Sequence, residues 1–211
     1  YTGWGASELA NKLFPSKAEP TGSWKDLHDE LRTLLTDDEL TTAARSTQYA
    51  HYTSKPIIDG IYDAISGFGF QSGLAVEGGA GTGNFIGLIP SALNVHYTGI
   101  EMDGISAKIA AALYPESGVI GGDFTKIALP QNHFDLAIGN PPYASIVVSN
   151  DQRDKKNKFL LHDYFIAKQI DSVRPGGLAV FVTSKGTMDK QSAAARDYLS
   201  ARANLLGAIR L

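Results

Sequence analysis

The sequence of 211 residues contains no cysteine, which excludes disulfide bonds and thiolate metal sites. Its five histidines are scattered, without the short spacing that places two metal ligands on one face. We therefore expect no metal site.

Long apolar runs are also absent. No stretch approaches the roughly 20 residues that span a bilayer, and the first ten residues, YTGWGASELA, lack the basic start and apolar centre of a signal peptide. We expect a soluble, cytoplasmic protein with no membrane partner. The net charge of -3 gives no overall attraction to a polyanion, so a nucleic-acid role would need a local basic patch or a further segment.

The length suits one sizeable domain with a small appendage. Residues 1–50 predict a helical extension, because WKDLHDELRTLL repeats apolar residues at helical spacing and Thr36 with Glu39 forms a capping box. A further helix is predicted in YTSKPIIDGIYDAI, where Ser54 can cap and Pro56 fits the first turn. Residues 51–211 are expected to form the second, larger domain.

From residue 73 onward, short apolar runs alternate with helical stretches. The predicted strands are LAVEGG, VHYTGIEM, GVIGGDF, FDLAIGN, GLAVFVTS and LLGAIRL. The predicted helices are NFIGLIPSAL, GISAKIAAALY, FLLHDYFIAKQIDSV and DKQSAAARDYLSARA. This alternation predicts an α/β fold with a doubly wound, mostly parallel sheet of the Rossmann-like type. Ligands bind such sheets at the carboxyl ends of the strands.

A glycine-rich turn, EGGAGTGNF at residues 77–85, follows the first predicted strand and opens the next helix. Gly79, Gly81 and Gly83 permit positive backbone angles and the close approach of a ligand, although a purely structural turn is the alternative. Glu77 in this region would repel a phosphate, and no lysine ends the turn as in a triphosphate-binding loop. The expected ligand is therefore not a phosphate.

Acidic residues end the next two predicted strands. Glu101 could accept hydrogen bonds from both hydroxyls of a ribose. Asp123 could accept from an adenine amino group while Phe124 packs against the base. Each acid could instead cap a helix or lie in solvent. At the ends of successive strands, they predict a nucleoside site without a pyrophosphate.

The fourth predicted strand ends in Asn140, Pro141, Pro142 and Tyr143. An exocyclic amine is a poor nucleophile because its lone pair is delocalised into the ring. Two rigid acceptors for its hydrogens would turn the lone pair toward an electrophile. The Asn140 side chain and the Pro141 carbonyl can be these acceptors, and Tyr143 can stack on a base. A plain Asn-Pro turn is the alternative.

Together these segments resemble the class I S-adenosylmethionine-dependent methyltransferases, specifically the gamma-type DNA adenine methyltransferases with an N-P-P-Y signature, over about residues 50–211. The resemblance implies S-adenosylmethionine as the cofactor, methylation of adenine N6 in flipped-out DNA, and a role in restriction-modification. It implies catalytic roles for Asn140, Pro141, Pro142 and Tyr143. It implies cofactor contacts at Tyr52, Thr53, Glu77, Gly79, Gly81, Gly83, Asn84, Phe85, Glu101, Met102, Asp123, Phe124 and Asn140.

YTGWGAS near the start and LHDYF at residues 161–165 resemble the methylase module of large phage- or plasmid-encoded proteins that join a DNA methylase to a helicase-like region. Gamma-type enzymes normally add a seventh, antiparallel strand and a DNA-reading domain after the catalytic core, and the sequence shows neither. We therefore expect a fragment of a longer protein, or a chain that depends on a linked or separate target-recognition or helicase region.

A basic run follows the catalytic motif, with four basic residues against one acid in Arg153 to Lys158. Its position favours contact with DNA phosphates, although a solvated loop is the alternative. The predicted DNA contacts are Arg153, Lys155, Lys156, Lys158 and Phe159, of which Phe159 could instead belong to the buried face of a helix. His162 could orient this region, but we assign it no chemical role because a sulfonium donor is already activated.

Two other functions remain open from the sequence. The conjugated amide of a protein glutamine could be methylated by the same chemistry. A module that binds the cofactor without catalysis could regulate a linked helicase-like region.

Overall fold

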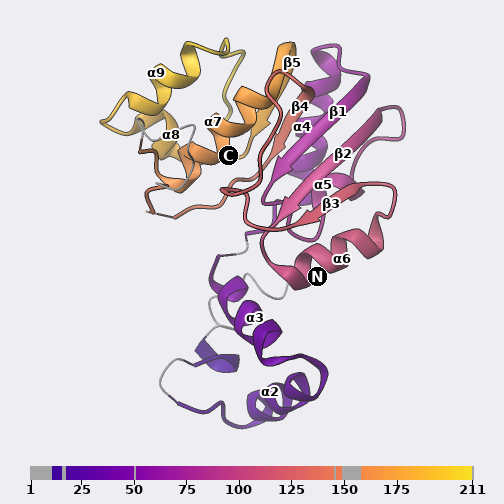
Figure 1. Cartoon of the computed structure of the whole chain (residues 1–211), viewed down its shortest axis with the longest axis vertical. Helices are drawn as coiled ribbons and strands as arrows, with labels where there is room; N and C mark the ends of the chain where they lie inside the picture. Colours follow the sequence, from indigo (N-terminus) through magenta and orange to yellow (C-terminus); the bar gives the residue numbers. More distant parts are fainter. Residues whose placement is uncertain (1–10, 16–17, 50, 145, 149–157, 211) are drawn as a thin grey trace.

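The computed structural model describes residues 11–15, 18–49, 51–144, 146–148 and 158–210 (Figure 1). The helices are α2 Ser23–Leu34, α3 Asp37–Tyr49, α4 Lys55–Gly67, α5 Asn84–Gly87, α6 Gly104–Leu113, α7 Leu161–Ser172, α8 Lys185–Asp189 and α9 Ala194–Ser200. The strands are β1 Ser72–Gly78, β2 Asn94–Glu101, β3 Gly118–Gly121, β4 Phe134–Gly139 and β5 Val173–Phe181.

The five strands form one sheet in the order β3-β2-β1-β4-β5, and every neighbouring pair is parallel. Strand order therefore reverses between β1 and β4, which pair through Ala75 with Leu136 and Val76 with Ala137. The predicted doubly wound α/β fold is confirmed. In such sheets the crevice outside the carboxyl ends of the strands at this reversal is the expected ligand site.

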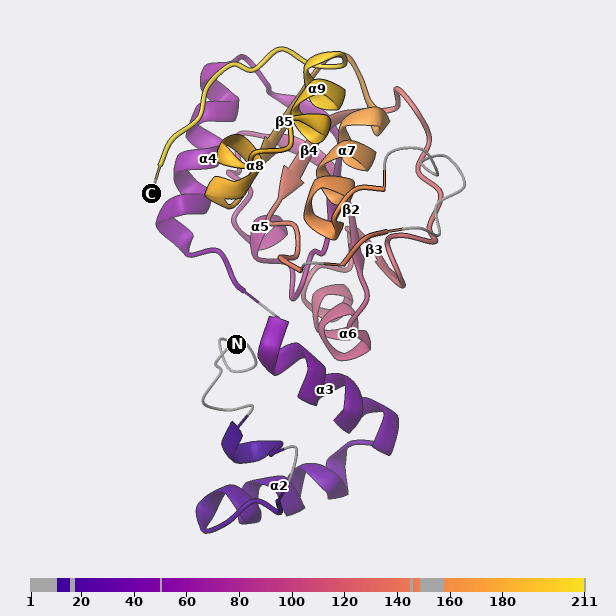
Figure 2. The same ribbon diagram turned by 90° about the vertical axis from the view of Figure 1, so that its left-hand side faces the viewer.

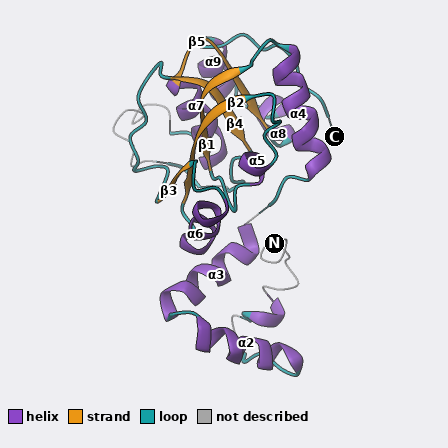
Figure 3. Ribbon diagram, turned by 90° about the vertical axis from the view of Figure 1, so that its right-hand side faces the viewer, coloured by secondary structure: helices purple, strands orange, loops and turns teal. Residues whose placement is uncertain are grey.

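Helices cover both faces of the sheet, with α4 on one face and α7 on the other (Figures 2 and 3). Successive residues of a strand point to opposite faces. In β1, Ala75 therefore belongs to the α4-side cluster and Val76 to the α7-side cluster. Leu136 and Ala137 divide in the same way in β4. Burial on both faces explains the continuous apolar runs of these strands.

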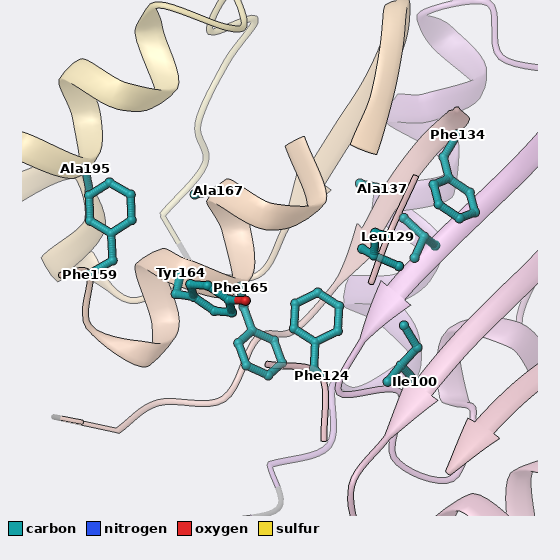
Figure 4. Packing of buried hydrophobic residues seen from close by; sticks show 11 residues of the cluster. Ile100, Phe124, Leu129, Phe134, Ala137, Phe159, Tyr164, Phe165, Ala167 and Ala195 are labelled. Atoms are coloured by element: carbon teal, nitrogen blue, oxygen red, sulfur yellow. The ribbon is translucent and has the colours of Figure 1, made fainter. Parts of the chain in front are cut away.

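On the α7 side, aromatic rings join the end of β3 to the helix. Figure 4 shows Phe124 beside Phe165, and their ring centroids lie 4.4 Å apart. Tyr164 approaches Phe124 edge-on at 6.5 Å. The cluster places α7 directly behind the carboxyl ends of β1, β3 and β4.

Helix α3 lies beside α6, and α2 lies beyond α3, away from the sheet (Figure 1). The predicted capping box is confirmed, since the Thr36 backbone N–H donates to Glu39 Oε2 at 3.0 Å and the Glu39 N–H donates to Thr36 Oγ1 at 3.3 Å. Lys108 of α6 forms an ion pair with Glu39 at 2.8 Å. These helices thus contact the sheet region through α6.

Several predicted elements differ from the structure. The helix predicted over residues 189–203 is shortened to α9, Ala194–Ser200. The predicted strand LLGAIRL is wrong, because residues 204–210 form no strand and stay exposed. A strand needs a neighbour, and β5 pairs only with β4 among the described residues. The helix predicted over residues 84–93 is shortened to α5, which ends at Gly87 ahead of Pro90. Within the described residues, no helix is both long and apolar enough to cross a membrane.

Candidate active site

The glycine turn after β1 and the Asn140–Tyr143 segment after β4 lie against each other at the reversal of strand order. A methyl group in place of a Gly79 hydrogen would lie 3.6 Å from Pro142 Cδ. At Gly139, the last residue of β4, a methyl group would lie 2.9 Å from Glu77 Cγ. The fold therefore brings the two predicted motifs together at the place where such sheets bind ligands.

The glycine turn has the backbone geometry that its sequence predicts. Gly79, Gly81 and Gly83 have φ angles of 80°, 57° and 84°, which residues other than glycine rarely adopt. The N–H groups of Gly79 and Ala80 donate to the Ile100 carbonyl at 2.8 and 3.1 Å, which ties the turn to β2. The turn is therefore a fixed cradle of main chain.

Glu101 joins the turn to the end of β2. Its Oε2 accepts the Gly81 N–H at 2.7 Å, and its Oε1 accepts the Asp103 N–H at 2.7 Å. Burial raises the pKa of Glu101, and these backbone hydrogen bonds partly offset that rise. A carboxylate offers about four acceptor positions, so Glu101 can also accept from a ribose hydroxyl.

Asp123 and Phe124 follow β3. Asp123 Oδ1 accepts from the Thr125 N–H at 2.9 Å and the Thr125 hydroxyl at 2.8 Å. Burial raises the pKa of Asp123, but these bonds and nearby Lys126 outweigh it and leave the pKa lowered. Phe124 is 3% exposed and forms part of the core. Asp123 thus caps its own turn, while its Oδ2 lies 3.6 Å from Lys126 Nζ.

Glu77 differs from its sequence interpretation, because it lies within β1 rather than in the turn. Its side chain is 2% exposed, and Oε2 accepts the Tyr97 hydroxyl at 2.6 Å. Burial raises the pKa of Glu77 to about 8, against the opposing effect of the Tyr97 hydrogen bond. The carboxyl is therefore mostly neutral at pH 7, and the argument that Glu77 repels a phosphate no longer holds.

Asn140 is held by the chain segment that precedes α4. Its Nδ2 donates to the His51 carbonyl at 3.2 Å. Because a carbonyl can only accept, this contact fixes which end of the amide is the oxygen. Asn140 Oδ1 is buried and has no hydrogen-bond partner among the residues that the structure describes. A buried, oriented acceptor without a partner costs free energy unless a ligand satisfies it.

Tyr143 turns back toward β5 and α7. Its ring stacks on His162 with centroids 4.7 Å apart and an interplanar angle of 19°, and its hydroxyl donates to the Val182 carbonyl at 3.3 Å. Burial raises the pKa of Tyr143. The His51 ring lies edge-on at 6.5 Å. The aromatic residue of the motif is therefore held at several points.

The segment before α4 reaches the glycine turn. A methyl group on Gly81 would lie 3.2 Å from Tyr52 Cε1, so the tyrosine ring covers the turn. Thr53 is buried, and its hydroxyl has no partner within the described part of the chain. Tyr52 and Thr53 therefore lie at the site.

Three other residues that were predicted to contact the cofactor differ in their burial and in their place in the fold. Asn84 opens α5, and its Oδ1 lies 3.4 Å from the Thr82 hydroxyl. Phe85 is 3% exposed in the α4-side core, and its carbonyl accepts the Tyr62 hydroxyl at 2.7 Å. Met102 is 72% exposed. Phe85 therefore supports the turn from inside the core.

Of the predicted DNA contacts, Arg153, Lys155 and Lys156 lie outside the described residues. Lys158 is exposed, with a φ of 48°. Phe159 is 5% exposed and packs edge-on against Tyr198 at 5.2 Å, so it is buried as in the alternative, but it lies before α7 rather than on a helix.

The sequence patterns did not indicate the polar residues of α7 that form hydrogen bonds with the main chain of the site. Gln169 is fully buried, and its Oε1 accepts the Gly78 N–H at 3.0 Å. Lys168 Nζ donates to the Phe124 carbonyl at 2.6 Å. The available signal was the presence of His162, Lys168 and Gln169 in a helix otherwise rich in apolar residues. Among the described residues, no group of three or more histidines or acids could hold a metal ion.

S-adenosylmethionine fits the residues at this site. The turn carries three glycines with positive φ, Glu101 can accept from a ribose, and Asn140 Oδ1 and Thr53 Oγ1 are buried polar atoms without partners in the described chain. A neutral Glu77 adds a further polar group at the base of the turn.

Comparison with known proteins agrees with this geometry. Residues 105–209 match the sequence model of the Eco57I restriction-modification methylase family. This range contains the Asn140–Tyr143 segment and α7, whereas the glycine turn precedes it. Defense against restriction protein B of Escherichia phage P1 is 30% identical over 165 residues, which are 76% of this chain and 7% of that protein. The chain thus spans a small part of this relative.

A Listeria monocytogenes protein assigned to the class I S-adenosylmethionine-dependent methyltransferases has a similar solved structure. The TM-score is 0.61 at 12% identity, over 94% of this chain and 70% of that chain. At this identity the likeness shows the fold alone. The chain has the class I methyltransferase fold, the match to restriction-modification methylases supports methyl transfer as its activity, and together they imply S-adenosylmethionine as the cofactor.

Proposed function

We propose that this chain is the catalytic part of a DNA methyltransferase that transfers a methyl group from S-adenosylmethionine to the N6 amine of adenine. The observation that carries the proposal is the buried acceptor Asn140 Oδ1, which has no partner in the described chain. The hydrogen bond from Asn140 Nδ2 to the His51 carbonyl orients this oxygen. The match to restriction-modification methylases favours DNA as the substrate.

The chemistry at the acceptor follows from the residues after β4. A base rotated out of the duplex presents its amino group to Asn140 Oδ1 and the Pro141 carbonyl, which accept its two hydrogens. Held in this way, the nitrogen lone pair would face the methyl group of S-adenosylmethionine, and the proton that the nitrogen loses on methylation would leave to water. The cofactor supplies the activated methyl group.

Cofactor binding is proposed for the main-chain cradle at Gly79, Gly81 and Gly83, together with Glu101 for the ribose. Tyr52 and Thr53 would cover the methionine part, and Asp123 would contact the adenine beside the Phe124 ring. Glu77, Asn84 and Phe85 would shape the cradle from below.

The substrate can be tested by methyl transfer from tritiated S-adenosylmethionine to unmethylated duplex DNA and, in parallel, to a protein that presents glutamine. We expect label in DNA, and enzymatic digestion should recover it as N6-methyladenine. Label in the protein alone would replace DNA by a glutamine amide as the substrate. Label in neither, with the cofactor bound, would favour a regulatory module.

Replacing Asn140 by alanine tests the acceptor itself. We expect Asn140→Ala to lower the rate of methyl transfer by about 100-fold or more, because an oriented hydrogen-bond partner of the reacting group is lost. Calorimetric affinity for S-adenosylmethionine should stay within a few-fold of the parent value. Asn94→Ala, at an exposed position at the start of β2, is the matched control and should retain activity. Full activity of Asn140→Ala would reject the assignment.

Phosphate contact is proposed for Lys158 and, in the part of the chain that the structure does not describe, for Arg153, Lys155 and Lys156. Each phosphate contact steepens the dependence of affinity on salt. We expect Lys158→Ala to weaken binding about equally for different DNA sequences and to reduce the slope of log affinity against log salt by about 1. Fluorescence anisotropy with two unrelated duplexes measures both effects. Lys25→Ala, in exposed α2, is the control.

A further inference from the structure

His162, the second residue of α7, lies directly behind the catalytic segment. Its ring is 8% exposed and stacks on Tyr143 at 4.7 Å. Its Nε2 lies 2.5 Å from Thr183 Oγ1, just after β5. Thr183 in turn shares a short hydrogen bond with Thr187 of α8. The ring is therefore fixed on one edge by a threonine pair and on one face by the aromatic residue of the motif.

The charged groups around His162 come from α7 and α8. The neighbouring Asp163 is buried and forms an ion pair with Lys190, which follows α8. Burial lowers the pKa of His162, and Lys190 lowers it further, while Asp163 and the carbonyls of Pro141 and Pro142 raise it. The net shift is downward, so the ring is neutral at pH 7.

The same helix fixes the cofactor side of the site. Gln169, two turns further along α7, accepts the Gly78 N–H, and Lys168 donates to the Phe124 carbonyl. Both side chains are at most 4% exposed. The single helix α7 therefore contacts the ends of β1, β3 and β4. His162 makes its contact with the segment that follows β4.

We propose that His162 is a positioning residue for methyl transfer, which acts through its stacking on Tyr143 to hold the amine acceptors in line with the glycine turn. This inference rests on the proposed function of the same site and adds a residue to it. The ring touches neither substrate nor cofactor in this role. Stacking supplies the larger part of the effect, because it is the contact that reaches the motif directly.

A purely structural role is the competing explanation, since a buried aromatic ring also stabilises the fold. The two roles differ in what a shape-conserving replacement does. Phenylalanine keeps a flat ring against Tyr143 but removes the hydrogen bond to Thr183. Alanine removes both contacts. Thr183→Val keeps the ring and removes only its hydroxyl anchor.

The test compares His162→Ala, His162→Phe and Thr183→Val with the parent protein, and uses His96→Ala at an exposed position of β2 as the control. Measurements are kcat and KM for S-adenosylmethionine and for the acceptor that the parent methylates, thermal unfolding, and hydrogen exchange of the peptide that contains Asn140 and Tyr143. We expect His162→Ala to lower kcat by about 10- to 100-fold, because small misplacement of a reacting group costs that much.

The expected pattern separates positioning from folding. In His162→Ala, the KM for the cofactor should not change and the Asn140–Tyr143 peptide should exchange faster. His162→Phe should recover most of kcat and of the protection, and Thr183→Val should fall between the two. Parent-like kcat in His162→Ala, or no recovery by His162→Phe, would overturn the proposal. If the parent methylates neither DNA nor protein, the proposed function fails, and the exchange comparison still decides the positioning role.

Discussion

At the scale of single residues, the buried carboxyl of Glu77 shows how burial changes chemistry. A carboxylate transferred from water into the core is penalised, so the proton is retained to a higher pH. In the sequence, Glu77 is simply an acid at the end of an apolar run, and a carboxyl group in such a position is ordinarily charged at pH 7. The side chain instead lies under Gly139 and accepts from Tyr97, within the wall between the two motifs.

This shift predicts how stability depends on pH. The pKa of Glu77 is about 8 in the folded chain, against 4.5 for an ordinary glutamic acid, so the folded state holds the proton more tightly. The contribution is complete below about pH 4.5 and is lost as the pH rises toward 8. Its full size is on the order of a few kcal/mol, since one pKa unit corresponds to about 1.4 kcal/mol.

Glu77→Gln should remove most of this dependence, because the amide is neutral throughout and its oxygen can still accept from Tyr97. Urea unfolding at pH 6 and pH 9 measures the free energy of unfolding of both proteins. The parent should lose more stability than the variant between these pH values. Glu116→Gln, at an exposed acid, should behave like the parent. Equal losses in parent and Glu77→Gln would contradict the burial argument.

At the scale of elements, the junction between β4 and the catalytic segment depends on one glycine. Gly139 has a φ of 148°, and its missing side chain leaves room for Glu77. The strand can therefore end in tight contact with β1 and place Asn140 beyond the carboxyl end of β4. A larger residue would move the start of the motif away from the glycine turn.

We expect Gly139→Ala to lower the free energy of unfolding by about 1–3 kcal/mol, because alanine is strained at this φ and its methyl group would lie 2.9 Å from Glu77 Cγ. Methyl transfer should fall as well. Gly60→Ala in α4 is the matched control, since nothing lies within 4 Å of the added methyl group there. In a helix this change should instead stabilise by roughly 0.5–1 kcal/mol. Chemical denaturation compares the two, and equal effects would reject the role of Gly139.

At the scale of the whole molecule, the sheet and the helices before it differ in how much they bury. The sheet is covered by α4 on one face and α7 on the other, and nine of the twelve residues of α7 are buried. By contrast, α2 has no buried residue. Its companion α3 meets α6, where the Lys108–Glu39 ion pair is mostly exposed on the lysine side and contributes little.

Hydrogen exchange should reflect this difference, because local opening costs less where few apolar contacts are broken. We expect amides of α2 to exchange well before those of β1, β4 and α7 at pH 7. Lys108→Ala should change global stability by less than about 1 kcal/mol, as for other exposed ion pairs. Protection of α2 equal to that of α7 would show that α2 is packed more tightly than its burial indicates.

Much of the fold could be predicted from the periodicity of apolar residues and from the residues that begin and end helices and strands. Five apolar runs became strands, of which β1 and β4 in the middle of the sheet hold runs of buried residues, whereas β3 and β5 at its edges hold none. The capping box at Thr36 is a local interaction that needs no tertiary contact. The strand predicted at residues 205–211 failed for the opposite reason. Its apolar residues were sufficient as a local pattern, but strand formation requires a neighbouring edge, and residues 204–210 do not pair with β5.

The sequence by itself determined which segments are proposed to carry the chemistry, because glycine conformations, proline constraints and the amide of Asn140 are properties of residues and their immediate neighbours. Tertiary structure decided what those segments can do together. It placed β4 beside β1, buried Glu77 until its carboxyl became neutral, and set His162, Lys168 and Gln169 of α7 behind three strand ends. These outcomes depend on desolvation and on contacts between residues far apart in the chain, which no local pattern encodes.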